Sequence, residues 1–179
     1  AALQVGETSL VTITFSEAVT GLTNADLSIA NGSLGPIASS DGGLTWTATF
    51  TPTASITDTT NLITLDNTGV TVGSSNPGIG MTSSSNYTID TVRPTATIVV
   101  SDTALKAGET ATVTFTFSEA VTGFTTADLT IANGTLSSVS SSDGGVTWTA
   151  TFTPTSGVTD ATNVITLDNT GVLDAAGNT

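Results

Sequence analysis

The chain repeats itself at a constant offset of 102 residues. Residues 2–76 align with 104–178 without a gap, and 51 of the 75 aligned positions are identical. The motif FSEAVTG, for example, begins at Phe15 and again at Phe117. A period of this length corresponds to a whole domain, because solenoid repeats have periods of about 20–50 residues. The sequence therefore predicts two similar domains in tandem, an arrangement that favours a structural role over a single catalytic pocket.

Composition restricts the classes of partner. The chain has 15 acidic residues against Lys106 and Arg93, which gives a net charge of −13. Nucleic acid and anionic membrane surfaces are disfavoured, because both are bound through Lys and Arg. No apolar run approaches the roughly 20 residues of a membrane-spanning helix, so membrane insertion is not expected. The absence of Cys excludes disulfides and thiol chemistry.

The residue pattern favours β-strands throughout. Apolar and Thr residues alternate in VTWTATFTPT from Val146 and in ATVTFTF from Ala111, which is the period of a half-buried strand. Asn133-Gly134 and Asp143-Gly144-Gly145 have the composition of hairpin turns. Strands are expected at about 95–101, 110–117, 127–132, 135–141, 146–153 and 163–168, and at 84–91 in the first copy. Seven short strands in about 100 residues predict a disulfide-free, immunoglobulin-like antiparallel β-sandwich, an all-β fold.

The repeat also predicts the domain boundary. Asp90 ends the last strand of the first copy and Pro94 restricts the link to extended conformations, so we expect domains at 1–92 and 93–179. Two full periods would need 204 residues, 25 more than the 179 of this chain. Repeat 1 is therefore expected to lack its first strand, and repeat 2 its last strand. The simpler explanation is that the chain is a fragment of a longer array; the alternative is that each copy has an open sheet edge.

Several motifs in the same order resemble a known family. FSEAVTGFTTADLTIANGTL, SSDGGVTWTATFTPT, LDNTGVLDAAGN and TIDTVRPTATI resemble the bacterial Ig-like repeats of very large surface adhesins of the RTX and biofilm-associated types. The resemblance covers nearly the whole chain. It implies secretion, a place on the bacterial surface, neighbouring repeats of the same polypeptide as partners, and calcium ions that stiffen the domain junctions.

The acidic residues suggest where calcium would bind. In a sandwich of this strand order, the loops SEAVTGFTTAD and LDAAGN lie at the end where the chain enters the second domain. The predicted ligands of this Ca²⁺ site are Asp90, Glu119, Asp128 and Asp174, since calcium prefers six to eight oxygen ligands. The alternative is that Glu119 and Asp128 cap backbone N–H groups of their loops. The first copy keeps Glu17 and Asp26 but has Val72 in place of Asp174, so its site should be weaker or empty.

An enzyme is not expected, because the chain has neither His nor Cys to form a nucleophile–base pair. The leading hypothesis is a calcium-stiffened extender of a long adhesin. One alternative is an adhesive module that itself binds glycan or ice, for which a flat Thr-rich face would serve. Another is a filament subunit that exchanges strands with other chains through its open sheet edges.

Overall fold

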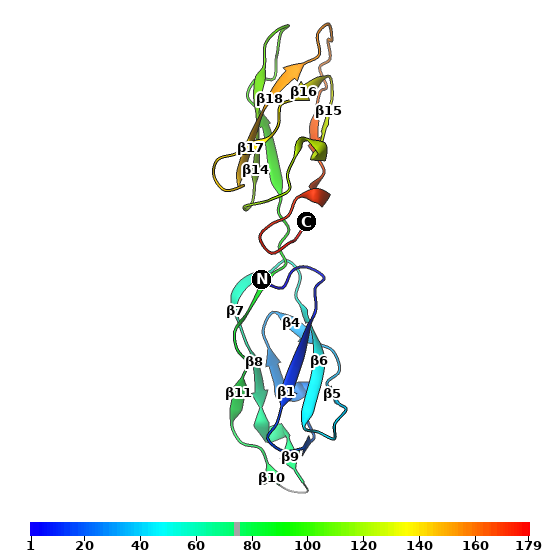
Figure 1. Ribbon diagram of the computed structural model, residues 1–179, viewed down its shortest axis with the longest axis vertical. Helices are drawn as coiled ribbons and strands as arrows, with labels where there is room; N and C mark the ends of the chain where they lie inside the picture. The colour runs from blue at the N-terminus through cyan, green and yellow to red at the C-terminus, as the bar shows by residue number, and fades with distance from the viewer. Residues whose placement is uncertain (74–75) are drawn as a thin grey trace. The chain divides into compact units, whose positions relative to one another are not determined.

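The computed structural model describes residues 1–73 and 76–179 as two compact units, Ala1–Val92 and Arg93–Thr179. Both units consist of short antiparallel strands and of 3-10 helices that are three residues long (Figure 1). The prediction of an all-β antiparallel chain is confirmed. In Figure 1 one colour scale runs along the chain, so unit 1 is blue to green and unit 2 is green to red.

The elements of unit 1 form several small sheets. β1 pairs with β6, which also pairs with β4 and β5; β8 lies between β3 and β11; β9 lies between β2 and β10; and β7 pairs with β12. Their bounds are β1 Ser9–Thr14, β2 Val19–Thr20, η1 Asn24–Asp26, β3 Leu27–Ile29, β4 Gly32–Leu34, β5 Ala38–Ser39, β6 Thr45–Pro52, β7 Thr57–Asn61, β8 Ile63–Asp66, η2 Asn67–Gly69, β9 Thr71–Val72, β10 Asn76–Pro77, β11 Met81–Ser83 and β12 Tyr87–Asp90.

Unit 2 repeats this plan with fewer strands. One sheet has the order β13-β14-β18-β16, with β17 also on β18, and the second sheet pairs β15 with β19. Their bounds are β13 Ala96–Val100, β14 Ala111–Phe117, η3 Thr126–Asp128, β15 Leu129–Ile131, β16 Gly134–Leu136, β17 Ser140–Ser141, β18 Thr147–Pro154, β19 Ile165–Leu167 and η4 Asn169–Gly171.

Each unit has its own core between the sheets. In β14 the side chains of Val113, Phe115 and Phe117 are almost fully buried, whereas the intervening Thr112 and Thr116 are exposed. This is the alternation that the sequence predicts for the strand. Phe124 packs edge-on against Phe115 and Phe117, and against Trp148 of β18. Aromatic contacts of this kind compensate for the small number of large residues in the chain.

The turn at Asn133-Gly134 differs from the sequence prediction. Asn133 has the positive φ of 52° that the prediction of a tight turn requires. However, β15 pairs with β19 while β16 pairs with β18, so this turn carries the chain from one sheet to the other and the hairpin prediction is wrong. Asp143-Gly144-Gly145 does connect two paired strands, β17 and β18, and that prediction is correct.

Candidate metal site

Two acidic residues of unit 2 lie close together. Carboxylate oxygens of Glu119 and Asp174 come within 4.8 Å of each other. Asp174 is 5% exposed and Glu119 is half-buried, so both side chains are partly removed from water. The structure thus brings together two of the four predicted ligands, from loops 55 residues apart in sequence (174 − 119).

Backbone hydrogen bonds fix the two loops to each other. Thr122 N donates to Leu173 O at 2.7 Å, and Leu173 N donates to Thr122 O at 3.0 Å. On either side of this bridge, Val121 and Val172 are buried in the core of unit 2. Each apolar anchor lies two residues from an acidic side chain, and this spacing is what carries Glu119 and Asp174 to the same edge of the unit.

The LDAAGN loop wraps around the carboxylate of Asp174. Its Oδ1 accepts hydrogen bonds from the backbone N–H groups of Ala176 (2.8 Å), Gly177 (2.7 Å) and Asn178 (2.9 Å). Its Oδ2 accepts from the side-chain amide of Asn178 at 2.7 Å. Gly177 has a φ of 105°, a conformation that glycine adopts without strain. The loop therefore holds one carboxylate in a defined orientation.

These hydrogen bonds also keep Asp174 charged. Burial alone would raise its pKa, but the bonds from Asn178, Gly177 and Ala176 outweigh burial and hold the pKa below its usual value. A carboxylate has about four acceptor positions, and three of the bonds fall on Oδ1. Oδ2 is therefore the oxygen with more room for a cation, and carboxylate oxygens are the ligands that calcium prefers.

Asp128 has a different local role. Its carboxylate accepts hydrogen bonds from the backbone N–H (2.7 Å) and hydroxyl (3.0 Å) of Thr125, which closes a capping box around η3. Asp26 does the same with Thr23 in unit 1. Among the residues that the structure describes, Asp128 does not belong to the acidic cluster that contains Glu119 and Asp174. Its position corresponds to the capping alternative considered from the sequence.

Asp90 belongs to unit 1, where it ends β12. Its Oδ1 accepts a hydrogen bond from the Thr57 hydroxyl at 2.9 Å and a longer one from Val92 N at 3.3 Å. The side chain is half-buried. Its contribution to a site with residues of the second repeat stays a prediction from the sequence.

Unit 1 has an apolar residue where unit 2 has Asp174. Val72 pairs with Val19 through β9 and β2 and packs against the core of unit 1. Glu17, the counterpart of Glu119, is exposed. The local backbone pairing is nevertheless the same in both units, since Thr20–Thr71 corresponds to Thr122–Leu173. The weaker or empty site expected in the first copy therefore stays a prediction. The chemical difference behind it is that Val72 replaces the carboxylate of Asp174.

Asn178 is the residue that sequence reasoning missed. It is 1% exposed, and both its backbone N–H and its side-chain amide donate to Asp174. The run Asp-x-x-Gly-Asn indicates a turn, because Asp, Gly and Asn are turn residues, but this composition does not specify the bonds that Asn178 makes.

Comparison with protein families gives matches that cover the whole chain. The model of the family described as "Bacterial Ig-like domain" matches twice, at residues 1–89 and 90–179. The chain belongs to this family. The immunoglobulin-like, disulfide-free sandwich expected from the sequence is thereby confirmed, as is the resemblance to bacterial Ig-like repeats. Comparison with curated proteins and with solved structures found no match.

Membership of this family indicates the general kind of function. Bacterial Ig-like domains are typically non-catalytic, all-β structural modules, and two adjacent copies are what a surface repeat array contains. In the described part of the chain, no helix has the length and apolar character needed to cross a membrane. Neighbouring repeats of the same polypeptide are thus the partners that the tandem arrangement supports.

Proposed function

We propose that the two domains are extender repeats of a long bacterial cell-surface adhesin. The observation that carries this proposal is the pair of adjacent family matches that together cover 1–179. Bacterial Ig-like domains are often extracellular, which favours a secreted, surface-bound parent protein. An acidic surface with net charge −13 favours solubility and cations over nucleic acid.

The extender role includes a calcium ion at Glu119 and Asp174. Two carboxylates within 4.8 Å of each other repel unless a positive charge lies near them, and a divalent cation relieves this repulsion. Asp90, three residues before the start of unit 2, is proposed from the sequence as a further ligand. A shared ion would couple the motion of the two domains and stiffen the array.

A calcium titration of the matched variants Asp174→Asn and Asp143→Asn tests this proposal. Both changes remove one negative charge, but Asp143 lies in the β17–β18 loop and does not belong to the acidic cluster that contains Glu119 and Asp174. We expect calcium to raise the melting temperature of the parent chain and of Asp143→Asn, because a ligand that binds the folded state stabilises it. Asp174→Asn should lose most of this response.

The stiffening itself is tested by ¹⁵N relaxation. With calcium, the amides of the two units should report one common rotational correlation time, and in the presence of a chelator they should report two shorter ones. Asp174→Asn should give the two shorter times under both conditions. Equal melting temperatures with and without calcium, together with unchanged relaxation, would contradict the calcium part of the proposal. They would leave the family membership intact.

A further inference from the structure

The dipeptide Asn-Gly occurs twice in the chain, at Asn31-Gly32 and at Asn133-Gly134. Both Asn residues have a left-handed backbone, with φ of 53° and 52°. Asn is a thermolabile residue, and it loses its amide most readily before glycine, which has no side chain to hinder attack by its own backbone nitrogen. These two pairs are therefore the positions at which the sequence is most open to spontaneous deamidation.

The reaction consumes only water. The backbone nitrogen of Gly32 attacks Cγ of Asn31, the bond between Cγ and Nδ2 breaks, and ammonia leaves with the proton that the glycine nitrogen gives up. Water then opens the cyclic imide at one of its two carbonyl groups. The product is an aspartate or an isoaspartate, in which the main chain continues through the side-chain carbon.

In the folded unit 1 the amide of Asn31 is held away from this reaction. Its Nδ2 donates to Asp58 Oδ2 at 2.7 Å and to Asn61 Oδ1 at 2.9 Å. Ring closure moves Cγ onto the nitrogen of Gly32 and expels Nδ2. Both hydrogen bonds must therefore break first, and the one to the carboxylate of Asp58 is charge-assisted.

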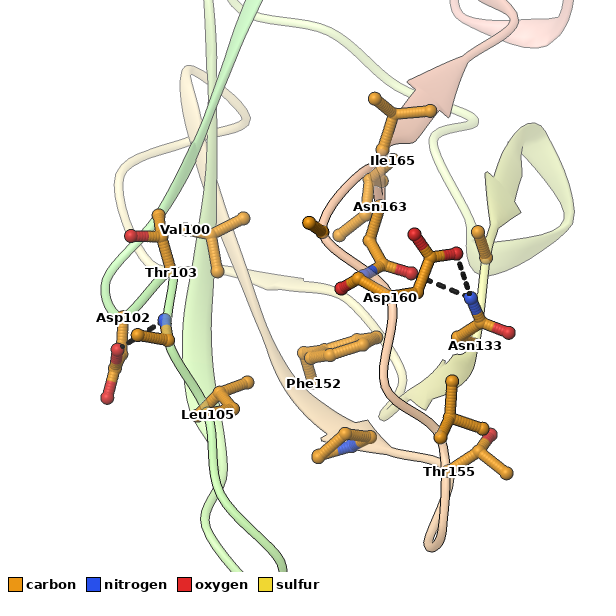
Figure 2. A pocket seen from close by; sticks show the side chains of 16 residues that line it. Val100, Asp102, Thr103, Leu105, Asn133, Phe152, Thr155, Asp160, Asn163 and Ile165 are labelled. Atoms are coloured by element: carbon orange, nitrogen blue, oxygen red, sulfur yellow. Dashed lines mark hydrogen bonds between the residues drawn. The ribbon is translucent and has the colours of Figure 1, made fainter.

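Unit 2 holds its Asn in the same way, as Figure 2 shows. Asn133 Nδ2 donates to Asp160 Oδ2 at 3.0 Å and to Asn163 Oδ1 at 2.8 Å. Asn163 donates its own amide to Asp160 O at 2.8 Å, so the three side chains form one set of hydrogen bonds. The protection expected for the first Asn-Gly pair is therefore expected for the second.

The backbone of the first pair is also fixed. Asn31 O accepts a hydrogen bond from Thr53 N at 2.9 Å, and Gly32 begins β4, which pairs with β6. A Cβ at Gly32 would meet the ring of Phe50 and the backbone oxygen of Thr51. Closing the imide ring requires rotation of this backbone, and packing this close leaves little room for it. We therefore expect the reaction to require opening of the domain.

The product cannot form the hydrogen bonds that it replaces. A carboxylate at position 31 has no hydrogen to donate, and it would lie beside the carboxylate of Asp58 and the side-chain oxygen of Asn61. Asn61 is 0% exposed and donates its amide to Asp58 O (3.0 Å) and Tyr87 O (3.2 Å), so reversing this amide would break both bonds. Two carboxylates this close repel each other. A domain that has reacted should therefore refold with lower stability.

We propose that Asn31 and Asn133 are sites of spontaneous deamidation that folding closes and unfolding opens. A domain that stays folded keeps its amide, and one that stays unfolded loses it. Because the loss is irreversible, it records that the domain has been open and leaves a domain that closes less firmly. This chemistry depends neither on calcium nor on the extender role, although an array under tension would accumulate the change in the repeats that open.

Peptide mass spectrometry tests which state of the domain reacts. The full chain is incubated at mildly alkaline pH with and without urea. In urea, Asn31 and Asn133 should gain the mass that separates a carboxyl from an amide, while Asn86, which precedes the bulky Tyr87, should not change. Without urea both reactions should be slower by about tenfold or more, because only the small open population reacts. Equal rates in the two conditions, or no reaction in urea, would overturn the proposal.

Asn31→Asp reproduces one product and tests its effect on the fold. The urea midpoint of unit 1 is followed through Trp46 in a chain that carries Trp148→Phe. It should fall in Asn31→Asp, and should fall less in Asn86→Asp, which adds the same charge at an exposed position.

The double variant Asn31→Asp with Asp58→Asn exchanges donor and acceptor. It should recover part of the lost stability, because an amide at position 58 can donate to the new carboxylate. This variant also gives a result if Asn31→Asp alone does not fold. No recovery in the double variant, or equal effects of Asn31→Asp and Asn86→Asp, would contradict the proposed effect of deamidation.

Discussion

The two units have similar sequences, but an additional strand covers a different sheet edge in each of them. In unit 2, β13 covers β14, and Val113 and Phe115 are fully buried. In unit 1 the equivalent β1 is an edge strand, and Val11 and Ile13 are half-buried. The opposite holds at the other edge, where β12 covers β7 in unit 1 and residues 159–163 of unit 2 form no strand.

Equivalent residues of the two units differ in burial because their neighbouring strands differ. Asn61 is 0% exposed, whereas Asn163, in an almost identical local sequence, is exposed. The difference comes from one neighbouring strand. Burial at each edge is thus determined by strand addition, and the energetic weight of equivalent residues should differ accordingly. Because Trp46 reports on unit 1 and Trp148 on unit 2, chains that retain one of the two allow each unit to be followed separately.

The largest difference is expected for Phe117→Ala against Phe15→Ala. Phe117 is 3% exposed and packs on Phe124 with 5.3 Å between ring centroids, whereas Phe15 is half-buried. Loss of Phe117 should reduce the free energy of unfolding of unit 2 by about 3–5 kcal/mol. Loss of Phe15 should cost unit 1 less than half as much, measured by urea unfolding. Equal costs would show that β1 is as well covered as β14.

Asn61→Ala against Asn163→Ala tests the other edge. Removing Asn61 takes away a buried side-chain donor to Tyr87 O and one of the two acceptors of the Asn31 amide, which keeps its bond to Asp58, so unit 1 should lose about 2–3 kcal/mol. Asn163 makes its bonds in contact with water, and its removal should cost less than about 1 kcal/mol. The same unfolding assay distinguishes the two, and a larger loss in unit 2 would contradict the comparison.

Gly32→Ala and Gly134→Ala test how freely the rings of Phe50 and Phe152 can move. A Cβ at either glycine would meet the ring of the facing phenylalanine, Phe50 or Phe152. Phe50 packs against Tyr87, whereas Phe152 lines a cavity of about 380 Å³ in unit 2 (Figure 2). Gly32→Ala should therefore cost about 1–3 kcal/mol in unit 1. Gly134→Ala should cost less, because the Phe152 ring can move into the cavity.

Acid titration should affect the equivalent residues Asp41 and Asp143 alike, and this pair serves as the internal control. Hydrogen bonds from Thr147, chiefly its backbone N–H, lower the pKa of Asp143 from 3.8 to about 2, and Thr45 does the same for Asp41. A carboxylate with a lowered folded-state pKa stabilises the fold above its unfolded pKa, and this contribution is lost as the pH falls from about 4 towards 2. Melting temperatures of both units should fall over that interval, less so in Asp41→Asn and Asp143→Asn respectively.

The sequence predicted the parts of the fold that alternation and repetition encode. The buried faces of β14 and β18 follow directly from their period of two. β7 was not predicted, because TDTTN is polar and looks like a loop until β12 pairs with it. The turn at Asn133 has the composition of a hairpin but connects two different sheets. Turn residues determine the local dihedral angles and not which strands pair afterwards.

For the candidate metal site, the sequence predicted the loops that approach each other but not all of the local hydrogen bonds. The loops that carry Glu119 and Asp174 were expected at one end of the domain, and the structure brings these two carboxylates together. The capping box of Asp128 depends on a local 3-10 turn that short polar sequences do not specify well. The role of Asn178 depends on how the LDAAGN loop closes on itself, which the order of residues alone does not determine.

Amide hydrogen exchange on the full chain tests the difference between the two edges most directly. We expect the amides of 57–61 to be protected by β12, and those of 159–163, which form no strand, to exchange rapidly. Equal protection of the two segments would contradict the account, because it would mean that a neighbouring strand covers both of them.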